Sequence, residues 1–268
     1  MSVSVQNEPV SSKLDSKILV IGVGGAGCNS LNRMYAMGFD SAELVAINTD
    51  KQHLSTIDDN IAKILIGKAV TQGFGAGGHV EVGAKSLEYS RKVVEELCSN
   101  AQLVFTIAGM GGGTGTGAAP LIAEIARKAG ALSIGIVTYP FDLERLKQAK
   151  AEDGIVAVSN VADSTIVIDN NRLLELVPNL PVNEAFKVAD ELICRTVRGI
   201  SETLTKPSLI NLDFADVKAV TANKGMSTIA VGESEASSNR AQEVVKDALS
   251  SALLDVDVFG AKGALIHI

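Results

Sequence analysis

Short apolar runs rich in β-branched residues alternate with longer stretches of helical periodicity over much of this chain. The runs lie at 17–22, 43–48, 62–67, 102–109, 132–138 and 164–169. Several are apolar at consecutive positions, which is typical of parallel strands that helices cover on both faces. The alternation therefore predicts an α/β fold with a doubly wound, mainly parallel, Rossmann-like sheet.

The pattern changes near residue 183, where apolar residues recur at helical spacing until Lys206 and Pro207. Beyond this helix the sequence predicts a short helix from about Asp213, a strand over 226–231, a helix over 239–254 and a strand from Gly263. We therefore expect four parts: a disordered N-terminal tail (1–16), a first domain (17–182), a central connecting helix (183–206) and a second α/β domain (207–268).

Composition argues against several classes of protein. The formal net charge is −7 at pH 7, and the basic residues are scattered, so we expect no nucleic-acid partner. Residues 1–16 hold no apolar run that could serve as a signal peptide or membrane anchor. The cysteines, Cys28, Cys98 and Cys194, are far apart and odd in number, which fits buried thiols in a reducing compartment. These features predict a cytoplasmic protein without direct membrane insertion and without a histidine or thiolate metal site.

A first glycine-rich loop, GVGGAG at 22–27, follows the first predicted strand and opens a helix. This is the dinucleotide fingerprint in its proper context, although the motif alone is a weak signal and can be a mere tight turn. Asp50 lies just past the second predicted strand, where a ribose-binding carboxylate of an NAD enzyme would lie. An NAD-dependent oxidoreductase is therefore one alternative.

A second loop, GGGTGTG at 111–117, also lies between a predicted strand and a predicted helix. Its glycines allow backbone N–H groups to turn toward a phosphate, the helix N-terminus adds positive charge, and Thr114 and Thr116 offer hydroxyl donors. A third glycine-rich segment, 75–83, precedes another helix. Because no GxxxxGK[ST] motif occurs, amides, helix dipoles and a divalent cation would have to neutralise a polyphosphate.

Seven segments in the same order resemble the tubulin/FtsZ superfamily, and within it the prokaryotic FtsZ family. They are GVGGAGCN, NTDKQ, GAGGHVEVG, GGGTGTG, TYPFDLE, DNNRLLEL and NLDFADV, and TYPFDLER is more similar to archaeal members. The resemblance implies a GTP-binding, GTP-hydrolysing protein that forms head-to-tail filaments at the division site. It also implies Mg²⁺, bound mainly through phosphates and water.

The resemblance further implies which residues hold GTP or GDP. The first loop would contact the phosphates through Gly24, Gly25, Ala26 and Asn29. The second would wrap the β- and γ-phosphates with Gly111, Gly112, Gly113, Thr114, Gly115, Thr116 and Gly117.

Four residues would bind the nucleoside by the same resemblance: Glu144 the ribose, Asn170 and Asp190 the guanine edge, and Phe186 its face. Phe186 and Asp190 are four apart, so they share one face of a helix. A carboxylate can accept from both the N1–H and the exocyclic amine of guanine, a pair that adenine does not offer. The alternative is that Phe186 is ordinary core and Asp190 a solvated surface residue.

No general base is evident near the glycine loops, whereas Asp213 and Asp216 lie at the start of a predicted helix, after Asn211. The resemblance implies that these three residues complete the active site of the next subunit in trans. Acids at this position can instead simply cap the helix. A non-hydrolysing structural or regulatory relative therefore stays open as a second alternative.

Two features depart from the family pattern. An arginine is expected four residues past Glu144, but Gln148 stands there, with Arg145 and Lys147 as candidate substitutes. The chain also ends within the predicted strand from Gly263, where family members continue. The second domain is thus expected to be partial, and division-ring adaptor proteins would bind a tail that is not present.

Overall fold

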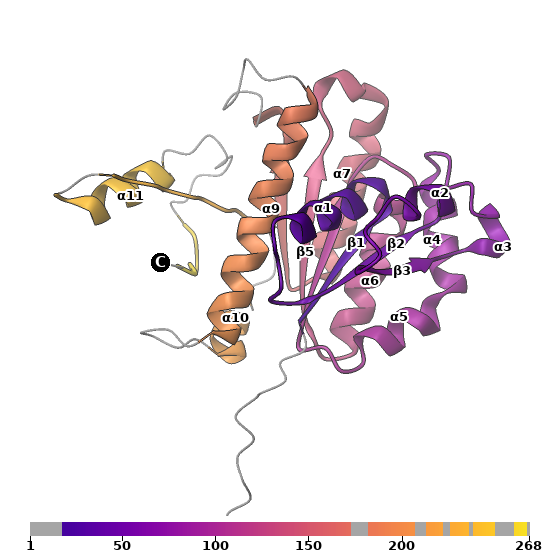
Figure 1. Ribbon diagram of the computed structural model, residues 1–268, viewed down its shortest axis with the longest axis horizontal. Coiled ribbons are helices and arrows are strands. Elements are labelled where there is room, and N and C mark those ends of the chain that lie inside the picture. Colours follow the sequence, from indigo (N-terminus) through magenta and orange to yellow (C-terminus); the bar gives the residue numbers. More distant parts are fainter. Residues whose placement is uncertain are drawn as a thin grey trace, which may run out of the picture.

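The computed structural model describes residues 18–172, 182–206, 213–221, 226–235, 238–249 and 260–266. Its centre is a sheet of seven parallel strands in the order β3-β2-β1-β4-β5-β6-β7 (Figure 1). The strands are β1 (Ile18–Val23), β2 (Glu43–Asn48), β3 (Ala62–Leu65), β4 (Leu103–Gly109), β5 (Leu132–Tyr139), β6 (Ser164–Asp169) and β7 (Met226–Ser227). The predicted doubly wound parallel α/β fold is confirmed.

Helices cover both faces of this sheet. One face packs against α1 (Gly24–Ala36), α9 (Val182–Thr205) and α10 (Phe214–Thr221). The other packs against α4 (Val80–Tyr89), α5 (Arg91–Cys98), α6 (Thr114–Lys128) and α7 (Arg145–Val161). The shorter helices are α2 (Lys51–Leu54), α3 (Lys68–Thr71) and the 3₁₀ turn η1 (Asp142–Glu144), and α11 (Arg240–Leu249) follows β7.

Strand β1 shows why the apolar runs are continuous. Ile18 and Val20 pack into the layer with α1 and α9, while Leu19 and Ile21 pack into the layer with α4, α5 and α6. All four side chains are buried. Because successive side chains of a strand point to opposite faces, a strand buried on both sides needs apolar residues at every position. Each such side chain contributes about 1.5–3 kcal/mol through burial.

The long helix predicted over 183–206 is present as α9, which packs on α1. Its buried residues Leu192, Ile193 and Val197 join the same apolar layer as Leu31 and Met34 of α1. With 24 residues, α9 is about 36 Å long. One end of it therefore lies far from the other, and α10 follows at the end away from Val182 (Figure 1).

The region after α10 differs from its prediction. The strand expected over 226–231 is only two residues long, and it pairs with β6 at the edge of the main sheet, with Thr165 opposite Met226. The apolar residues Ile229 and Val231 pack against the core without joining a strand. Most of the predicted strand is therefore held by side-chain packing, and its backbone pairs with the sheet only at Met226 and Ser227.

The other elements beyond α9 agree only in part. Helix α10 begins at Phe214 as expected, and α11 covers 240–249 of the helix predicted over 239–254, of which 250–254 lie outside the described residues. The strand predicted from Gly263 is absent from the described residues 263–266. Residues 1–16 lie outside the described part, and the division into a tail, two domains and a connecting helix stays a prediction. None of the described helices is long and apolar enough to cross a membrane.

Candidate functional site

The two signature glycine loops meet where the winding of the sheet reverses. Strand β1 pairs with β2 on one side and with β4 on the other, and Val23 lies opposite Ala108 near the carboxyl ends. In open parallel sheets, ligands bind outside the carboxyl ends of the strands at this switch point. The loops at 22–27 and 111–117 follow β1 and β4 and are therefore at the expected place for a ligand.

The first loop turns directly from β1 into α1. Gly24 has φ +72°, a left-handed conformation that favours glycine. A Cβ added at Gly24 would lie 2.9 Å from Gly115 N, so the two loops touch backbone to backbone. Gly25, Ala26 and Asn29, three of the predicted phosphate contacts, are exposed on the first turns of α1. Their exposure leaves the N-terminal end of α1 open to an anion.

In the second loop, neighbouring atoms closely surround all the glycines except one. Gly111 has φ +94°, and its N–H donates to Thr116 Oγ1 at 2.9 Å. A Cβ at Gly115 would lie 2.6 Å from Gly109 O, and one at Gly117 would lie 2.2 Å from Val80 O. Gly113 is similarly hemmed in by Ala76 and His79.

Gly112 and the two threonines complete this loop. A Cβ at Gly112 would have no heavy atom within 4 Å, so this residue borders open space at the start of α6. Thr114 Oγ1 is hydrogen-bonded to Thr49 Oγ1 at 2.7 Å, and both Thr114 and Thr116 are buried. The threonine hydroxyls, expected as phosphate donors, thus make hydrogen bonds that hold the loop together.

The start of α7 lies against the second loop. A Cβ at Gly111 would lie 2.6 Å from Lys147 Cβ, and the Lys147 ammonium is paired with Glu144. Gln148, at the position of the family arginine, donates to Asp142 Oδ1 at 3.0 Å. Of the two candidate substitutes for that arginine, Lys147 is therefore in direct contact with the loop.

Lys150 links the same helix to the third glycine segment. Its Nζ donates to Gly78 O at 2.9 Å. Gly83, at the other end of that segment, packs where a Cβ would lie 2.2 Å from Gly113 O. All three glycine-rich segments are thereby joined into one cluster.

Two predicted base-binding residues have unsatisfied or exposed groups. Asn170 directly follows β6 and is 4% exposed, yet its Oδ1 has no hydrogen-bond partner among the described residues. An unpaired buried acceptor costs about 1–3 kcal/mol, which a ligand's N–H would recover. Phe186 is 43% exposed, so it is not ordinary core. Its ring packs edge-on against Phe141 with centroids 5.0 Å apart.

Asp190 is not a solvated surface residue. Its carboxylate accepts from Ser30 Oγ at 2.5 Å and from Arg33 Nε at 3.1 Å, both on α1. Burial raises the pKa of Asp190, against the opposing effect of these two hydrogen bonds. Ser30 and Arg33 were missed by the sequence reasoning. The sequence did offer one signal for them: they are three residues apart on the helix that carries Asn29, so they share one face of it.

Asp213 and Asp216 cap the start of α10. Asp213 N donates to Asp216 Oδ2 at 3.1 Å, and Asp216 N donates to Asp213 Oδ1 at 2.9 Å. The capping role that was left open for these acids is therefore present, and each carboxylate keeps a second oxygen. They lie beyond the far end of α9 and do not join the glycine loops of the same chain (Figure 1). Asn211 lies outside the described residues.

Neither a metal cluster nor a reactive thiol is evident in the described part of the chain. No group of three or more histidine, cysteine or acidic side chains there is arranged to hold a metal ion. The three cysteines are free and buried, and burial raises the pKa of Cys28 to about 12. The thiols are structural, as predicted.

A parallel sheet with glycine loops at its switch point defines an α/β nucleotide-binding protein. The chain belongs to the tubulin/FtsZ family. The model of the Tubulin/FtsZ family GTPase domain matches residues 17–178, and that of the FtsZ family C-terminal domain matches residues 225–268. The predicted resemblance is confirmed, and the NAD-dependent alternative has no support.

Archaeal proteins are among the similar sequences. Cell division protein FtsZ 2 of Methanocaldococcus jannaschii is 56% identical over 95% of this chain and 67% of its own length. Its namesake in Haloferax volcanii is 52% identical over 95% of this chain and 63% of its own length. This chain thus spans about two thirds of these relatives. A solved FtsZ dimer of M. jannaschii has 46% identity and a TM-score of 0.85, covering 91% of this chain and 71% of that one.

Proposed function

We propose that this chain binds and hydrolyses GTP and assembles into filaments for cell division. The observation that carries the proposal is the backbone contact between Gly24 and Gly115, which joins two phosphate-type loops at the switch point of the sheet. The similar archaeal proteins are named cell division proteins, in agreement with this function.

The described residues suit a guanine nucleotide laid across the carboxyl ends of the strands. Its phosphates would lie on Gly24–Ala26 and Asn29 and on the loop 111–117, where N–H groups and two helix N-termini stabilise negative charge. Glu144 would accept from the ribose. The unpaired Asn170 Oδ1 and the Asp190 carboxylate would accept from the base edge, and the exposed ring of Phe186 would stack on its face.

Mg²⁺ would be held mainly by the phosphates and water, because the described residues offer no protein cluster for it. When bound, it would supply further positive charge to the phosphates. The residues of the chain itself would bind and orient the nucleotide, and they would exclude water other than the attacking water. The sequence has no P-loop lysine motif, so backbone N–H groups and helix ends would stabilise the phosphates.

Hydrolysis would be completed by a second copy of the chain. Asp213 and Asp216, with Asn211, would position the attacking water over the nucleotide of the next subunit. A contact of this kind joins different surfaces of two copies, so it repeats head to tail and builds an open filament. The similar solved FtsZ dimer agrees with self-association. The filament would form in the cytoplasm at the division site, where division-ring adaptor proteins would bind it.

The nucleotide that co-purifies with the chain tests this function. The protein is denatured, and the released ligand is identified by chromatography and mass spectrometry. GDP or GTP supports the proposal, whereas NAD would overturn it. Bound GTP that never turns over, even at high protein concentration, would leave only the non-hydrolysing alternative.

A further inference from the structure

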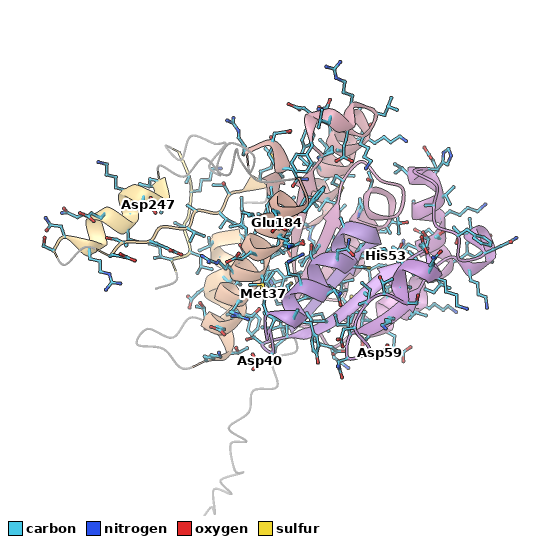
Figure 2. The ribbon with its side chains drawn as sticks, turned by 45° about the horizontal axis from the view of Figure 1, so that its top comes forward. Met37, Asp40, His53, Asp59, Glu184 and Asp247 are labelled. Carbon is cyan, nitrogen blue, oxygen red and sulfur yellow. The ribbon has the colours of Figure 1, made fainter. Side chains whose placement is uncertain are left out.

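We propose that His53 is a further nucleotide-contacting residue, whose Nε2–H donates a hydrogen bond to a phosphate oxygen at Gly24–Gly25. The inference rests on the nucleotide site proposed above. His53 belongs to α2, directly after β2, and lies at the end of α1 opposite to Met37 (Figure 2). A Cβ added at Gly25 would have His53 Nε2, at 3.8 Å, as its only heavy-atom neighbour within 4 Å. The imidazole therefore borders the exposed start of α1.

The hydrogen bonds of Asn48 determine which ring nitrogen of His53 carries the hydrogen. Asn48 Oδ1 accepts from Thr49 N at 2.8 Å and from Asp50 N at 3.3 Å, which fixes the orientation of the amide. Asn48 Nδ2 then faces His53 Nδ1 at 3.3 Å. An amide NH₂ can only donate, so Nδ1 is the acceptor and the hydrogen lies on Nε2. A donor is thus available beside the first glycine loop.

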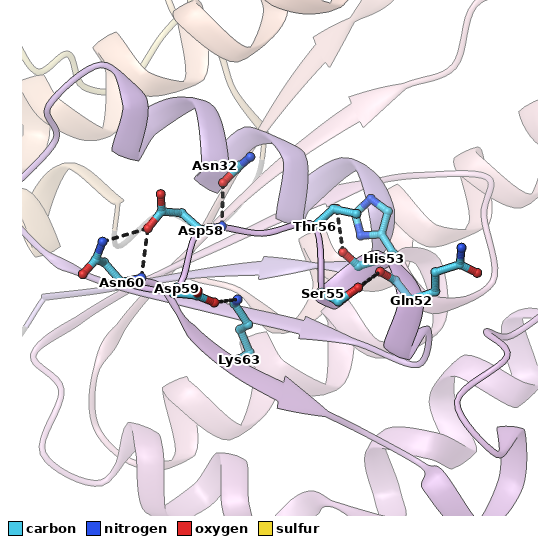
Figure 3. Close-up of polar contacts among 9 residues, drawn as sticks. All are labelled: Asn32, Gln52, His53, Ser55, Thr56, Asp58, Asp59, Asn60 and Lys63. Atoms are coloured by element: carbon cyan, nitrogen blue, oxygen red, sulfur yellow. Dashed lines mark hydrogen bonds and ion pairs between the residues drawn. The ribbon is translucent and has the colours of Figure 1, made fainter.

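Hydrogen bonds hold both the backbone N–H and the backbone C=O of His53. Its N–H donates to Asp50 Oδ1 at 3.0 Å. Its C=O accepts from Thr56 Oγ1 at 2.7 Å (Figure 3). Among the described residues, Nε2 itself has no hydrogen-bond partner. A donor that is held in place but not used inside the protein loses little conformational freedom on binding.

The chemistry of the site explains why such a donor would be useful. The sequence has no P-loop lysine, so the phosphates would otherwise be met by backbone N–H groups and helix ends. A hydrogen bond to an ionised phosphate oxygen is stronger than one between neutral groups. We therefore expect the Nε2–H donor to strengthen nucleotide binding about tenfold.

Three substitutions at His53 separate the donor from the shape of the ring. His53→Gln can place an amide N–H near the position of Nε2, whereas His53→Asn reaches only as far as Nδ1. His53→Ala removes both. Dissociation constants for GTP and for guanosine are measured by calorimetry or by competition. Ala and Asn should weaken GTP binding about tenfold, and Gln should retain most of the affinity. Guanosine, which lacks phosphates, should bind all four proteins equally.

Thr56→Ala is the matched control, because it removes the hydrogen bond to the His53 carbonyl but keeps the imidazole. It should bind GTP as the unmodified chain does. Equal losses in Thr56→Ala and His53→Ala, no difference between Gln and Asn, or a parallel loss for guanosine would each overturn the inference while the proposed function stands. An unmodified chain that binds no GTP would overturn both.

Discussion

Ser30 Oγ on α1 donates a 2.5 Å hydrogen bond to Asp190 Oδ1 on α9. Arg33 Nε donates to the other carboxylate oxygen at 3.1 Å. The carboxylate is therefore held where the helix that carries the first glycine loop packs on the central helix. The proposed base recognition and the packing of these two helices therefore depend on the same side chain.

Asp190→Ala should weaken GTP binding by about 1–3 kcal/mol, because the N–H groups of the guanine edge lose their acceptor. The affinity of each variant for GTP, and its preference for GTP over ATP, are measured by competition between the two nucleotides. Glu191→Ala is the control, since Glu191 is the next residue of α9 and pairs with Arg195 on an exposed face. Equal affinity of the unmodified chain for ATP and GTP would contradict guanine recognition.

Gly112→Leu should abolish nucleotide binding and leave the fold intact. The new side chain enters open space, since a Cβ there has no heavy atom within 4 Å, and it would obstruct the close approach of a phosphate. The melting temperature and the GTP affinity are measured together. In the control, Gly115→Ala, a Cβ would lie 2.6 Å from Gly109 O, so this variant should melt lower. Retention of GTP affinity in Gly112→Leu would remove Gly112 from the site.

The parallel sheet and the glycine loops could be predicted because their signals are local. The continuous apolar run at 17–22 reports burial on both faces of one strand, and the position of GGGTGTG after a strand reports a turn into a helix. Both hold in the structure, as β1 and as the start of α6. Asn170 could be assigned only through the family motif, and its unpaired Oδ1 is visible only in the fold.

Contacts between distant segments could not be predicted in the same way. Ser30 and Asp190 are 160 residues apart, and their contact depends on how α9 lies on α1. His53 lies beside Gly25 because β1 and β2 are neighbours in the sheet. Similarly, the strand pattern at 226–231 indicates apolar burial but not the pairing partner, which is β6, so that β7 becomes the edge strand of the sheet. Tertiary packing decided each of these.

Cys28 should resist alkylation in the native protein. Burial raises its pKa to about 12, so at about pH 8 almost no thiolate, the reactive form, is present. Iodoacetamide treatment followed by mass spectrometry should find Cys28 unmodified in the native chain and modified in denaturant, which serves as the control. Rapid labelling of Cys28 without denaturant would show that the layer between α1 and the sheet opens readily.

The mutual capping of Asp213 and Asp216 decides which substitutions test hydrolysis in trans. Alanine would remove a cap as well as a charge, and loss of a cap costs about 0.5–2 kcal/mol of stability. Asparagine caps a helix about as well as aspartate, so Asp213→Asn and Asp216→Asn remove only the negative charge. Both variants should fold normally and bind GTP with unchanged affinity, because α10 lies beyond the far end of α9 from the nucleotide loops. Their turnover of GTP should fall strongly.

Mixing experiments then show whether the acids act on a neighbouring subunit. GTP turnover per molecule of the unmodified chain should rise steeply with protein concentration, since each site needs a second copy. At a GTP concentration that leaves its weakened site largely empty, Asp190→Ala still carries both acids, whereas Asp213→Asn holds the nucleotide and lacks one acid. Neither variant alone should turn over GTP well. A mixture should recover part of the activity, because at some contacts Asp190→Ala supplies its acids to a nucleotide that Asp213→Asn holds. The matched control mixes Asp213→Asn with Asp216→Asn, which have no complete acid pair to offer and should stay inactive. A turnover per molecule that does not depend on concentration, together with no recovery on mixing, would refute catalysis between subunits.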